Sequence, residues 1–355
     1  VGGVDLEYNI RLVKTTAIKR RAYEQGIHLL NDCLDEELCP DDPQSFVGRQ
    51  QQRFINLGLA TGDRVIHIGE GVEEWLKERS TNPNPVPGLR SGFPDLDQEI
   101  GGFQGGRAYL FAARTKNRKS ILLNNFAVNI AVNDGAPVLY LDTAMQTEAD
   151  VRPRILSILS GVDTELIETG MYATNPEFND SVTKAAKVAK KLPFYHAYLP
   201  NFNLNQVVSI VRKYYIKHGI KALFFDYIKL PIGTMGDGAK EYQLLGQMMA
   251  ALKDLAGELD IPLITAAQLN RKGEQLAEDG KPSDDMIGGS DRLIHNTSYL
   301  FFLWKKSEGQ IAKDGGEQSG NMCLYLAESR HGGDYFAWLN AHPKNARITE
   351  IMNLS

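Results

Sequence analysis

From about residue 107 onward, short and continuously apolar segments alternate with longer segments of helical periodicity, and this alternation strongly constrains the fold. Strands that are apolar at nearly every position must be covered on both faces, which predicts a parallel sheet with helices on each side. We therefore expect a doubly wound α/β domain whose ligands bind beyond the carboxyl ends of the strands. Strands are expected at 107–113, 137–143, 222–227, 261–268, 299–304, 322–327 and 335–340, and helices at 120–133, 205–218 and 241–259.

Residues 82–88 read Asn-Pro-Asn-Pro-Val-Pro-Gly, with three prolines in five positions. Such a segment cannot continue a helix and favours a stiff, extended spacer, so we place a domain boundary there. The preceding residues 1–81 are expected to be a small, mainly helical region, with one helix over 5–31 and a helical segment over 72–79. The basic face of the first helix is either simply solvated or docks on a neighbouring subunit. Residues 89–355 then form the α/β domain.

The net charge of −5 leans against a generic nucleic-acid binder, although phosphate binding needs only local positive charge. The three cysteines, Cys33, Cys39 and Cys323, do not form a disulfide framework, and their spacing does not fit a zinc site. A reducing, intracellular setting is therefore expected. No apolar run is long enough to span a bilayer, so we expect no membrane association.

A candidate phosphate-binding loop lies between the first expected strand and the helix after it. The usual loop has Gly, four residues, Gly, Lys and then Ser or Thr, but here Ala113 and Arg118 replace both glycines. A Lys-Ser pair at a helix start is usually only a cap. The strand-to-helix turn nevertheless favours a phosphate site, because helix N-terminal amides hold anionic oxygens. The residues expected to contact a nucleotide are Arg114, Thr115, Lys116, Asn117, Arg118, Lys119 and Ser120.

Within that loop, Lys119 is expected to reach the β- and γ-phosphates, and the Ser120 hydroxyl to bind Mg²⁺. Asp226 ends the apolar run of the third expected strand. Because burying an unpaired carboxylate is costly, a magnesium-organising role is favoured over packing. Gln268 ends the next strand and is placed to sense the γ-phosphate, although its position alone is not decisive.

These segments together resemble the DnaB-type and phage replicative helicases. The resemblance covers about residues 87–340 and rests on matches in the family's order: Gly92–Asp97, Lys119-Ser120, Asp226–Leu230 and Ala267–Arg271. It implies a RecA-like motor that uses ATP and Mg²⁺, forms a homo-oligomeric, hexameric ring and translocates on single-stranded DNA. It also implies the cytoplasm of a bacterium or of a phage-infected host, with a primase or a helicase loader as candidate partners.

The resemblance also implies residue roles. Lys119, Ser120 and Asp226 would hold Mg-ATP, and Gln268 would report its state to the DNA-binding loops. Arg330 resembles the arginine finger given to the neighbouring subunit's nucleotide, with a surface ion pair as the alternative. The implied DNA-binding loop comprises Met286, Ile287, Gly288, Gly289 and Ser290, and Arg271 and Lys272 would add charge nearby.

Two departures from the family pattern concern the nucleotide contacts. Arg118 stands where glycine is usual, so it either weakens nucleotide binding through lost backbone freedom or adds a phosphate contact. Glu328 stands where a basic residue is usual, two positions before the finger. One contact across the subunit interface is therefore absent or reversed.

A third departure concerns hydrolysis. Ala144, just before Met145, occupies the position of the glutamate that polarises the attacking water. We favour an introduced Glu→Ala change that traps a bound state. The alternatives are lost hydrolysis, or substitution by Asp142 or Glu148.

Three functions share these features: a ring helicase, a RecA-type recombinase ATPase, and a catalytically inactive, oligomeric DNA-binding scaffold. The Gln-Leu-Asn-Arg segment, the stiff linker and the basic helix favour the helicase. Because function belongs to the site and not to the fold, fold likeness alone does not separate the three.

Overall fold

The computed structural model describes residues 26, 67–229, 241–269, 291–329 and 335–351. The chain divides into two compact units, one comprising residues 1–83 and 203–214 and the other residues 84–202 and 215–355. In the first unit, helix α3 (Val72–Thr81) covers the helical segment expected there. The expected helix over 5–31 lies outside the described residues except for Gly26. The proposed division into a docking region, a linker and a motor domain stays a prediction.

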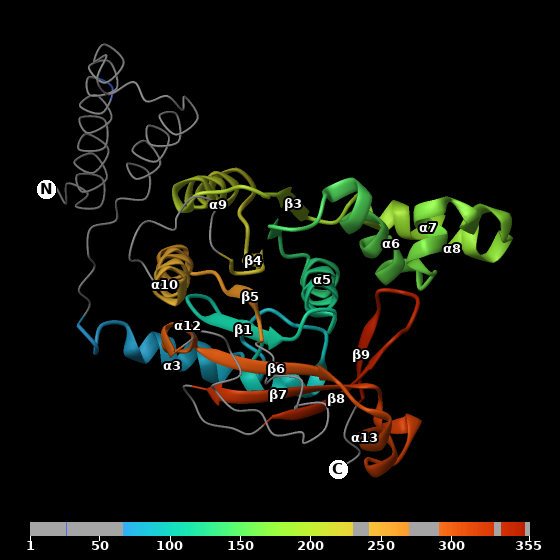
Figure 1. Cartoon of the computed structure of the whole chain (residues 1–355). Helices are drawn as coiled ribbons and strands as arrows, with labels where there is room; N and C mark the ends of the chain where they lie inside the picture. Colours follow the sequence, from blue (N-terminus) through green and yellow to red (C-terminus); the bar gives the residue numbers. More distant parts are fainter. Residues whose placement is uncertain (1–25, 27–66, 230–240, 270–290, 330–334, 352–355) are drawn as a thin grey trace, which may run out of the picture. The chain divides into compact units, whose positions relative to one another are not determined.

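The second unit is built on a nine-stranded sheet in the order β3-β2-β4-β5-β1-β6-β7-β8-β9 (Figure 1). All pairings from β3 to β6 in this order are parallel, and those from β6 to β9 are antiparallel. The predicted doubly wound, mostly parallel sheet is thus confirmed. The strands are β1 (Ala108–Ala113), β2 (Val138–Asp142), β3 (Phe194–Tyr198), β4 (Ala222–Asp226), β5 (Leu263–Gln268), β6 (Tyr299–Lys305), β7 (Met322–Ser329), β8 (Phe336–Ala341) and β9 (Ile348–Ile351).

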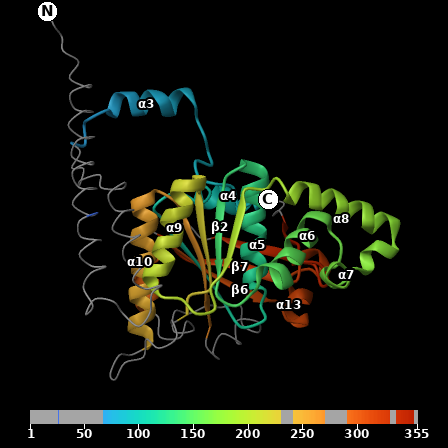
Figure 2. The ribbon, with the colours of Figure 1, turned by 90° about the horizontal axis from the view of Figure 1, so that it is seen from above.

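Helices lie on both sides of the parallel strands, with α5 on one side and α10 on the other (Figure 2). None of the described helices is long and apolar enough to cross a membrane. Besides α3, the described helices are α4 (Pro94–Ile100), α5 (Lys119–Asn129), α6 (Arg152–Ser160), α7 (Thr164–Thr169), α8 (Pro176–Ala189), α9 (Leu204–His218), α10 (Glu241–Leu259), α12 (Asp291–His295) and α13 (Glu308–Lys313). Two short π-helices, η1 (Ile130–Asp134) and η2 (Thr147–Val151), and two 3-10 helices, η3 (Met171–Thr174) and η6 (Glu317–Ser319), complete the set.

Aromatic side chains at matching register positions of neighbouring strands form the core beneath α5. Phe111 of β1 stacks on Phe301 of β6 with ring centroids 4.7 Å apart. Tyr140 of β2 stacks on Phe224 of β4 at 5.5 Å. Phe126 of α5 is fully buried against Phe111 at 5.3 Å, so the helix is seated on this layer. Such pairs add about 0.5–1.5 kcal/mol each beyond the burial of their area.

The structure also contains elements that the sequence pattern did not predict, among them β3, β9, the short helices α4, α12 and α13, and the helical segment α6–α8 between β2 and β3. Strand β3 is the edge strand next to β2 and is only partly buried, so its sequence lacks a continuous apolar run. The pairing becomes antiparallel beyond β6, where β7, β8 and β9 follow one another along the chain.

Strand β9 and the turn before it hold elements from early in the chain. The Glu350 carboxylate of β9 accepts hydrogen bonds from the amides of Asp95 and Leu96 at the start of α4, at 2.9 and 3.2 Å. The buried Asn125 of α5 donates to the carbonyl of Ala346 at 2.8 Å and accepts from the amide of Ile348 at 3.1 Å. The β8–β9 turn, residues 342–347, is therefore fixed against α5.

Replacing Phe126 with alanine should lower the free energy of unfolding by about 3–5 kcal/mol, because the change empties a fully buried site between α5 and the sheet. The urea midpoint followed by circular dichroism measures the loss. Phe336→Ala is the control, since that side chain is 41% exposed and should cost much less. Equal losses in the two variants would contradict the assignment of Phe126 to the core.

Candidate nucleotide site

Four strands bring their carboxyl ends to one edge of the sheet, where the sequence placed the candidate site. Asp142 and Asp226 are register partners at the ends of β2 and β4. Ala113 and Gln268 are partners at the ends of β1 and β5. The chain leaves β1 directly into the candidate phosphate loop and then enters α5. Strand β5 lies between β1 and β4, so the loop starts at the same sheet edge as the two buried acids, one strand away from the one that ends in Asp226.

The loop between β1 and α5 contains two non-glycine residues in the left-handed region, Lys116 with φ 66° and Arg118 with φ 59°. A turn closes within it, where the Asn117 amide donates to the Arg114 carbonyl at 3.1 Å. Arg118 is the N-cap of α5, and its own side chain does not cap the helix by a hydrogen bond. The N-terminal amides and the positive end of the helix dipole are thus suited to an anionic ligand.

Lys119, Ser120 and Asp226 converge beside the N-terminus of α5. The Lys119 ammonium donates to the loop carbonyls of Ala113 at 3.0 Å and Arg114 at 3.4 Å. Burial lowers its pKa, the negative charge of Asp226 raises it, and the positive charge of Arg114 lowers it further. The sequence placed these three residues in one site, and the structure brings them together. Their roles toward a nucleotide stay predictions.

Asp226 is almost completely buried, and burial raises the pKa of its carboxyl group to about 6. The negative charge of the nearby Asp142 is the second contribution to this rise. Tyr140 and Ser120 lower it by hydrogen bonding, and Lys119 lowers it by its charge. One carboxylate oxygen, Oδ2, accepts the Tyr140 hydroxyl at 2.7 Å. Among the described residues, the other oxygen has no partner at normal hydrogen-bonding distance.

This set of groups fits a magnesium-bound phosphate. An unpartnered carboxylate oxygen, a serine hydroxyl and a lysine are the groups that phosphate-loop proteins present to Mg²⁺ and to terminal phosphates. Within the described part of the chain, no group of three or more His, Cys, Asp or Glu residues gathers to hold a metal.

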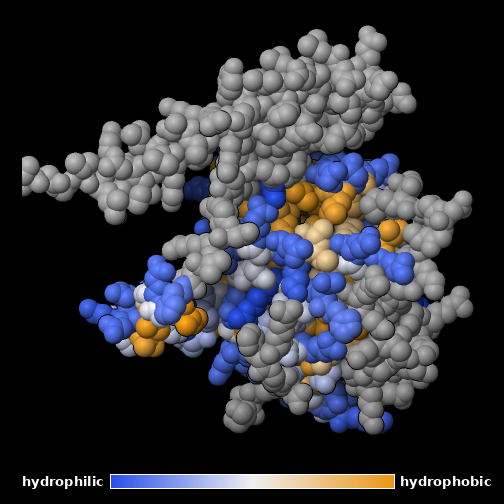
Figure 3. Space-filling view, turned by 90° about the vertical axis from the view of Figure 1, so that its left-hand side faces the viewer, coloured by the Kyte–Doolittle hydropathy of each residue, from blue (hydrophilic) through white to orange (hydrophobic). Residues whose placement is uncertain are grey.

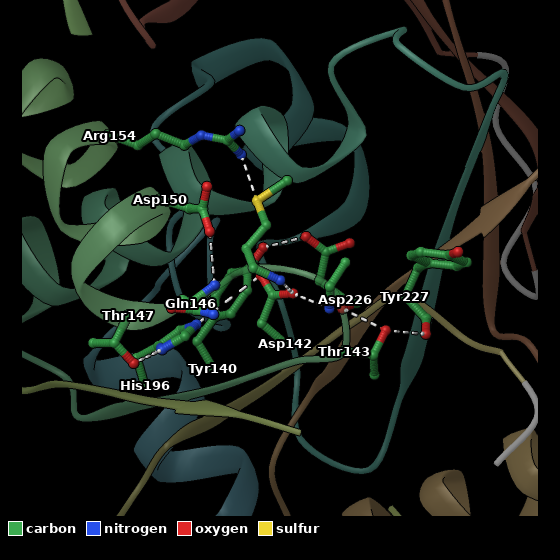
Figure 4. Close-up of polar contacts among 12 residues, drawn as sticks. Tyr140, Asp142, Thr143, Gln146, Thr147, Asp150, Arg154, His196, Asp226 and Tyr227 are labelled. Carbon is green, nitrogen blue, oxygen red and sulfur yellow. Dashed lines mark hydrogen bonds and ion pairs between the residues drawn. The ribbon is translucent and has the colours of Figure 1, made fainter. Parts of the chain in front are cut away.

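The segment that carries Ala144 is fixed by Asp142 (Figure 4). The Asp142 Oδ1 atom accepts the amides of Ala144 at 2.8 Å and Met145 at 2.7 Å. Its Oδ2 atom lies 4.0 Å from Nε2 of the buried His196, whose Nδ1 pairs with the Thr147 hydroxyl at 2.7 Å. Ala144 itself is exposed at the carboxyl end of β2.

The two acids considered as substitutes for a glutamate at position 144 differ in their surroundings. Asp142 is 1% exposed and close enough to Asp226 to raise its pKa. The Glu148 side chain is 80% exposed and pairs with Arg152 of the next helical turn at 3.2 Å. Of these two residues, only Asp142 lies beside the Asp226 carboxylate.

The other predicted site residues fall into two groups. Gln268 is exposed at the end of β5, and Arg114 donates to the carbonyl of the adjacent Leu269 at 3.1 Å. Thr115 and Lys116 are exposed in the loop, and Glu328 lies in β7 as the register partner of Leu300. The remaining predictions lie outside the described residues: Arg330, Arg271, Lys272, Met286, Ile287, Gly288, Gly289 and Ser290.

Sequence reasoning missed three side chains that shape the site. Tyr140 alternates with Asp142 on β2 and binds Asp226, and the alternation of strand side chains was a usable signal for it. His196 comes from the unpredicted edge strand β3. Lys229 donates to the Thr143 carbonyl at 2.6 Å and so ties the segment after β4 to the one that carries Ala144.

The sheet order and the loop after β1 define a RecA-like α/β domain of the phosphate-loop class. Residues 88–349 match the family described as DnaB-like helicase C terminal domain. The chain belongs to this family, whose members are ATP-hydrolysing replicative helicases.

Similar proteins point the same way. The chain is 23% identical to the replicative DNA helicase DnaB of Rickettsia bellii, a match that covers 96% of the chain and 69% of the relative. It is 24% identical to a probable plasmid replicative DNA helicase of Chlamydia muridarum, over 79% of the chain and 60% of the relative.

Two solved structures resemble the fold. One is a DnaB-like replicative helicase described with its interactions with primase (TM-score 0.68, 19% identity, 98% of this chain and 80% of the other). The other is the ATPase domain of G40P (TM-score 0.70, 19% identity, 81% of this chain and 100% of the other). At these identities, the likeness concerns the fold.

Asp226→Asn should raise the thermal midpoint of the nucleotide-free protein near pH 7.5 and give no gain near pH 4. The folded-state pKa of about 6 lies above the ordinary 3.8, so the folded protein holds this proton more tightly. Stability is therefore lost as pH rises between these two values, and asparagine removes that loss. Thermal unfolding across this pH range measures the effect. Asp180→Asn, which removes an exposed carboxylate, is the control, and a gain independent of pH would contradict the explanation.

Proposed function

We propose that this chain is the motor of a ring-forming replicative helicase that binds Mg-ATP and translocates on single-stranded DNA. Membership of the DnaB-like helicase family supports the class of activity. The observation that carries the proposal is the convergence of Lys119, Ser120 and the buried Asp226 at the uncapped N-terminus of α5.

In this proposal, the phosphates lie along the loop after β1 and take hydrogen bonds from the first amides of α5. Lys119 exchanges its contacts with the loop carbonyls for a terminal phosphate. The Ser120 hydroxyl and the unpartnered oxygen of Asp226 would hold the magnesium ion, which would neutralise phosphate charge when bound. Gln268, at the end of β5 beside the loop, senses the γ-phosphate.

Hydrolysis depends on what replaces the family's glutamate at position 144. The methyl group of Ala144 cannot accept a proton, so we propose that the chain binds ATP and turns it over poorly. Asp142 is the acid nearest in sequence to the missing glutamate that also lies beside Asp226. Its Oδ1 atom is committed to two backbone amides. This commitment supports a structural role for Asp142 over a full replacement of the glutamate.

Assembly into a ring is supported by the surface of α3. Its apolar residues Val72, Trp75 and Leu76 recur at helical spacing and are 43%, 54% and 55% exposed. Apolar side chains also reach the surface among hydrophilic ones on the face seen in Figure 3. In the proposed ring, Arg330 acts on a neighbour's nucleotide, and residues 286–290, with Arg271 and Lys272, meet the DNA. The relative described with primase makes a primase a candidate partner.

Two other functions are separated by experiment. A RecA-type recombinase shares the fold and the ATP site, and it would exchange strands without directional unwinding. A catalytically inactive DNA-binding scaffold would bind no nucleotide at all. The match to the helicase family over residues 88–349 favours the motor over both.

ATP turnover should be slow in this chain and should rise by orders of magnitude in Ala144→Glu, with stimulation by single-stranded DNA. The glutamate restores a proton acceptor at the end of β2, where a well-placed general base contributes about 10²–10⁴-fold. Phosphate release with and without DNA measures the rate. Ala144→Gln is the matched control, since it has the size of glutamate but not its basicity. An unchanged rate in the glutamate variant would contradict the assignment of position 144.

Asp142→Asn tests whether the neighbouring acid supplies the residual turnover. If Asp142 is structural, the variant keeps the residual rate, because an asparagine oxygen still accepts the two amides. A further fall of tenfold or more, with ATP affinity unchanged, would instead assign the base to Asp142. Single-turnover phosphate release in excess enzyme separates this chemistry from product release.

A further inference from the structure

Arg118 replaces the loop glycine and yet keeps a backbone conformation that favours glycine. Its φ of 59° and ψ of 24° lie in the left-handed region, immediately before the first residue of α5. A side chain with a Cβ atom is disfavoured there, so something must offset the cost.

The guanidinium of Arg118 binds the β8–β9 turn. Its Nη1 atom donates to the His342 carbonyl, and its Nη2 atom donates to the Pro343 carbonyl at 3.2 Å. The two hydrogen bonds are charge-assisted and come from the two terminal nitrogens of the guanidinium, which makes them strong and directional. Two of its five N–H donors, one on each terminal nitrogen, therefore contact protein carbonyls and hold the side chain against the turn.

The carbonyls that receive Arg118 belong to a turn that is itself fixed from α5 and α6. Asn125 of α5 binds the backbone of Ala346 and Ile348. Arg347 donates to the carbonyls of Ile158 and Leu159 in α6, at 2.6 and 3.0 Å. The turn is thus a firm anchor, and a side chain attached to it restricts the backbone from which it comes.

We propose that Arg118 is a positioning residue, which holds the phosphate loop in its left-handed, phosphate-accepting conformation by tethering it to the β8–β9 turn. In this chain the tether does what backbone freedom does where the loop has glycine. Nucleotide affinity then depends on a contact between residues 224 positions apart. The proposal rests on the proposed function, since it takes a nucleotide as the ligand of the loop.

The test compares Arg118→Ala, Arg118→Gly and Arg118→Lys in the full chain, with ATP and Mg²⁺ titrated by calorimetry. Alanine removes the tether and keeps the Cβ, so ATP should bind about tenfold more weakly, given the cost of a left-handed L-residue. Glycine removes both the tether and the Cβ atom, so it should restore most of the ATP affinity that alanine loses. Lysine should resemble alanine, because an ammonium does not reproduce the paired contact.

Two results would overturn the tether. One is equal weakening by alanine and glycine with rescue by lysine, which would assign Arg118 to a direct phosphate contact. The other is unchanged affinity in all three variants. A role confined to overall stability would lower the thermal midpoint without separating alanine from glycine in affinity.

Hydrogen exchange without nucleotide gives an independent measurement. The Leu122 amide, which donates to the Arg118 carbonyl at 2.9 Å, should exchange faster in Arg118→Ala, as should the turn at 342–347. Lys116→Ala is the control, since Lys116 is the other left-handed residue of the loop and is exposed. In this variant, exchange of the Leu122 amide and of residues 342–347 should stay unchanged. Unaltered exchange in Arg118→Ala would reject the tether. If the unaltered chain binds no ATP, the proposed function fails, and exchange alone decides on the tether.

Discussion

The buried carboxylate of Asp226 is the interaction around which the site is arranged. A carboxylate removed from water must be neutralised or hydrogen-bonded, and here the Tyr140 hydroxyl, the Ser120 hydroxyl and the Lys119 ammonium share that task. These groups come from three elements, so β2, β4 and α5 must meet at one edge of the sheet. The aromatic layer beneath α5 fixes this meeting, because Tyr140 stacks on Phe224 in the same pair of strands. Stability and binding chemistry thus depend on the same contacts. These contacts do not fully offset the energetic cost of burying the charge, so the pKa of Asp226 stays raised.

Much of the fold could be predicted from sequence because continuous apolar runs signal strands covered on both faces. Strands β1, β2, β4 and β5 were recognised in this way, with ends that differ by one or two residues. Strand β3 carries a histidine and lies partly exposed at the edge, so its pattern is not distinctive. The antiparallel pairing beyond β6 depends on the connections between strands and not on apolar content. Periodicity therefore could not predict it.

Some residues of the candidate site could likewise be predicted from local sequence, and others could not. The positions of Lys119, Ser120 and Asp226 followed from strand ends and the turn before α5, which are local features. The part played by Arg118 depends on carbonyls of a turn more than two hundred residues later, and no local pattern indicates such a contact. His196 belongs to an unrecognised strand, so its approach to Asp142 was equally hidden. Long-range geometry, more than residue chemistry, limited what the sequence could predict.

Strand β9 contacts elements that lie more than two hundred residues earlier in the sequence. Its Glu350 holds the start of α4, the backbone of Ile348 meets Asn125 of α5, and these partners are 255 and 223 residues apart in the chain. Contacts between such distant residues form late, because closing a long segment of chain costs entropy before any contact repays it. Helices α4 and α5, which are synthesised long before β9, therefore wait for that strand before they are fully held. A chain shortened ahead of β9 would lose support on α4 and α5, far from the cut, and not merely one edge of its sheet.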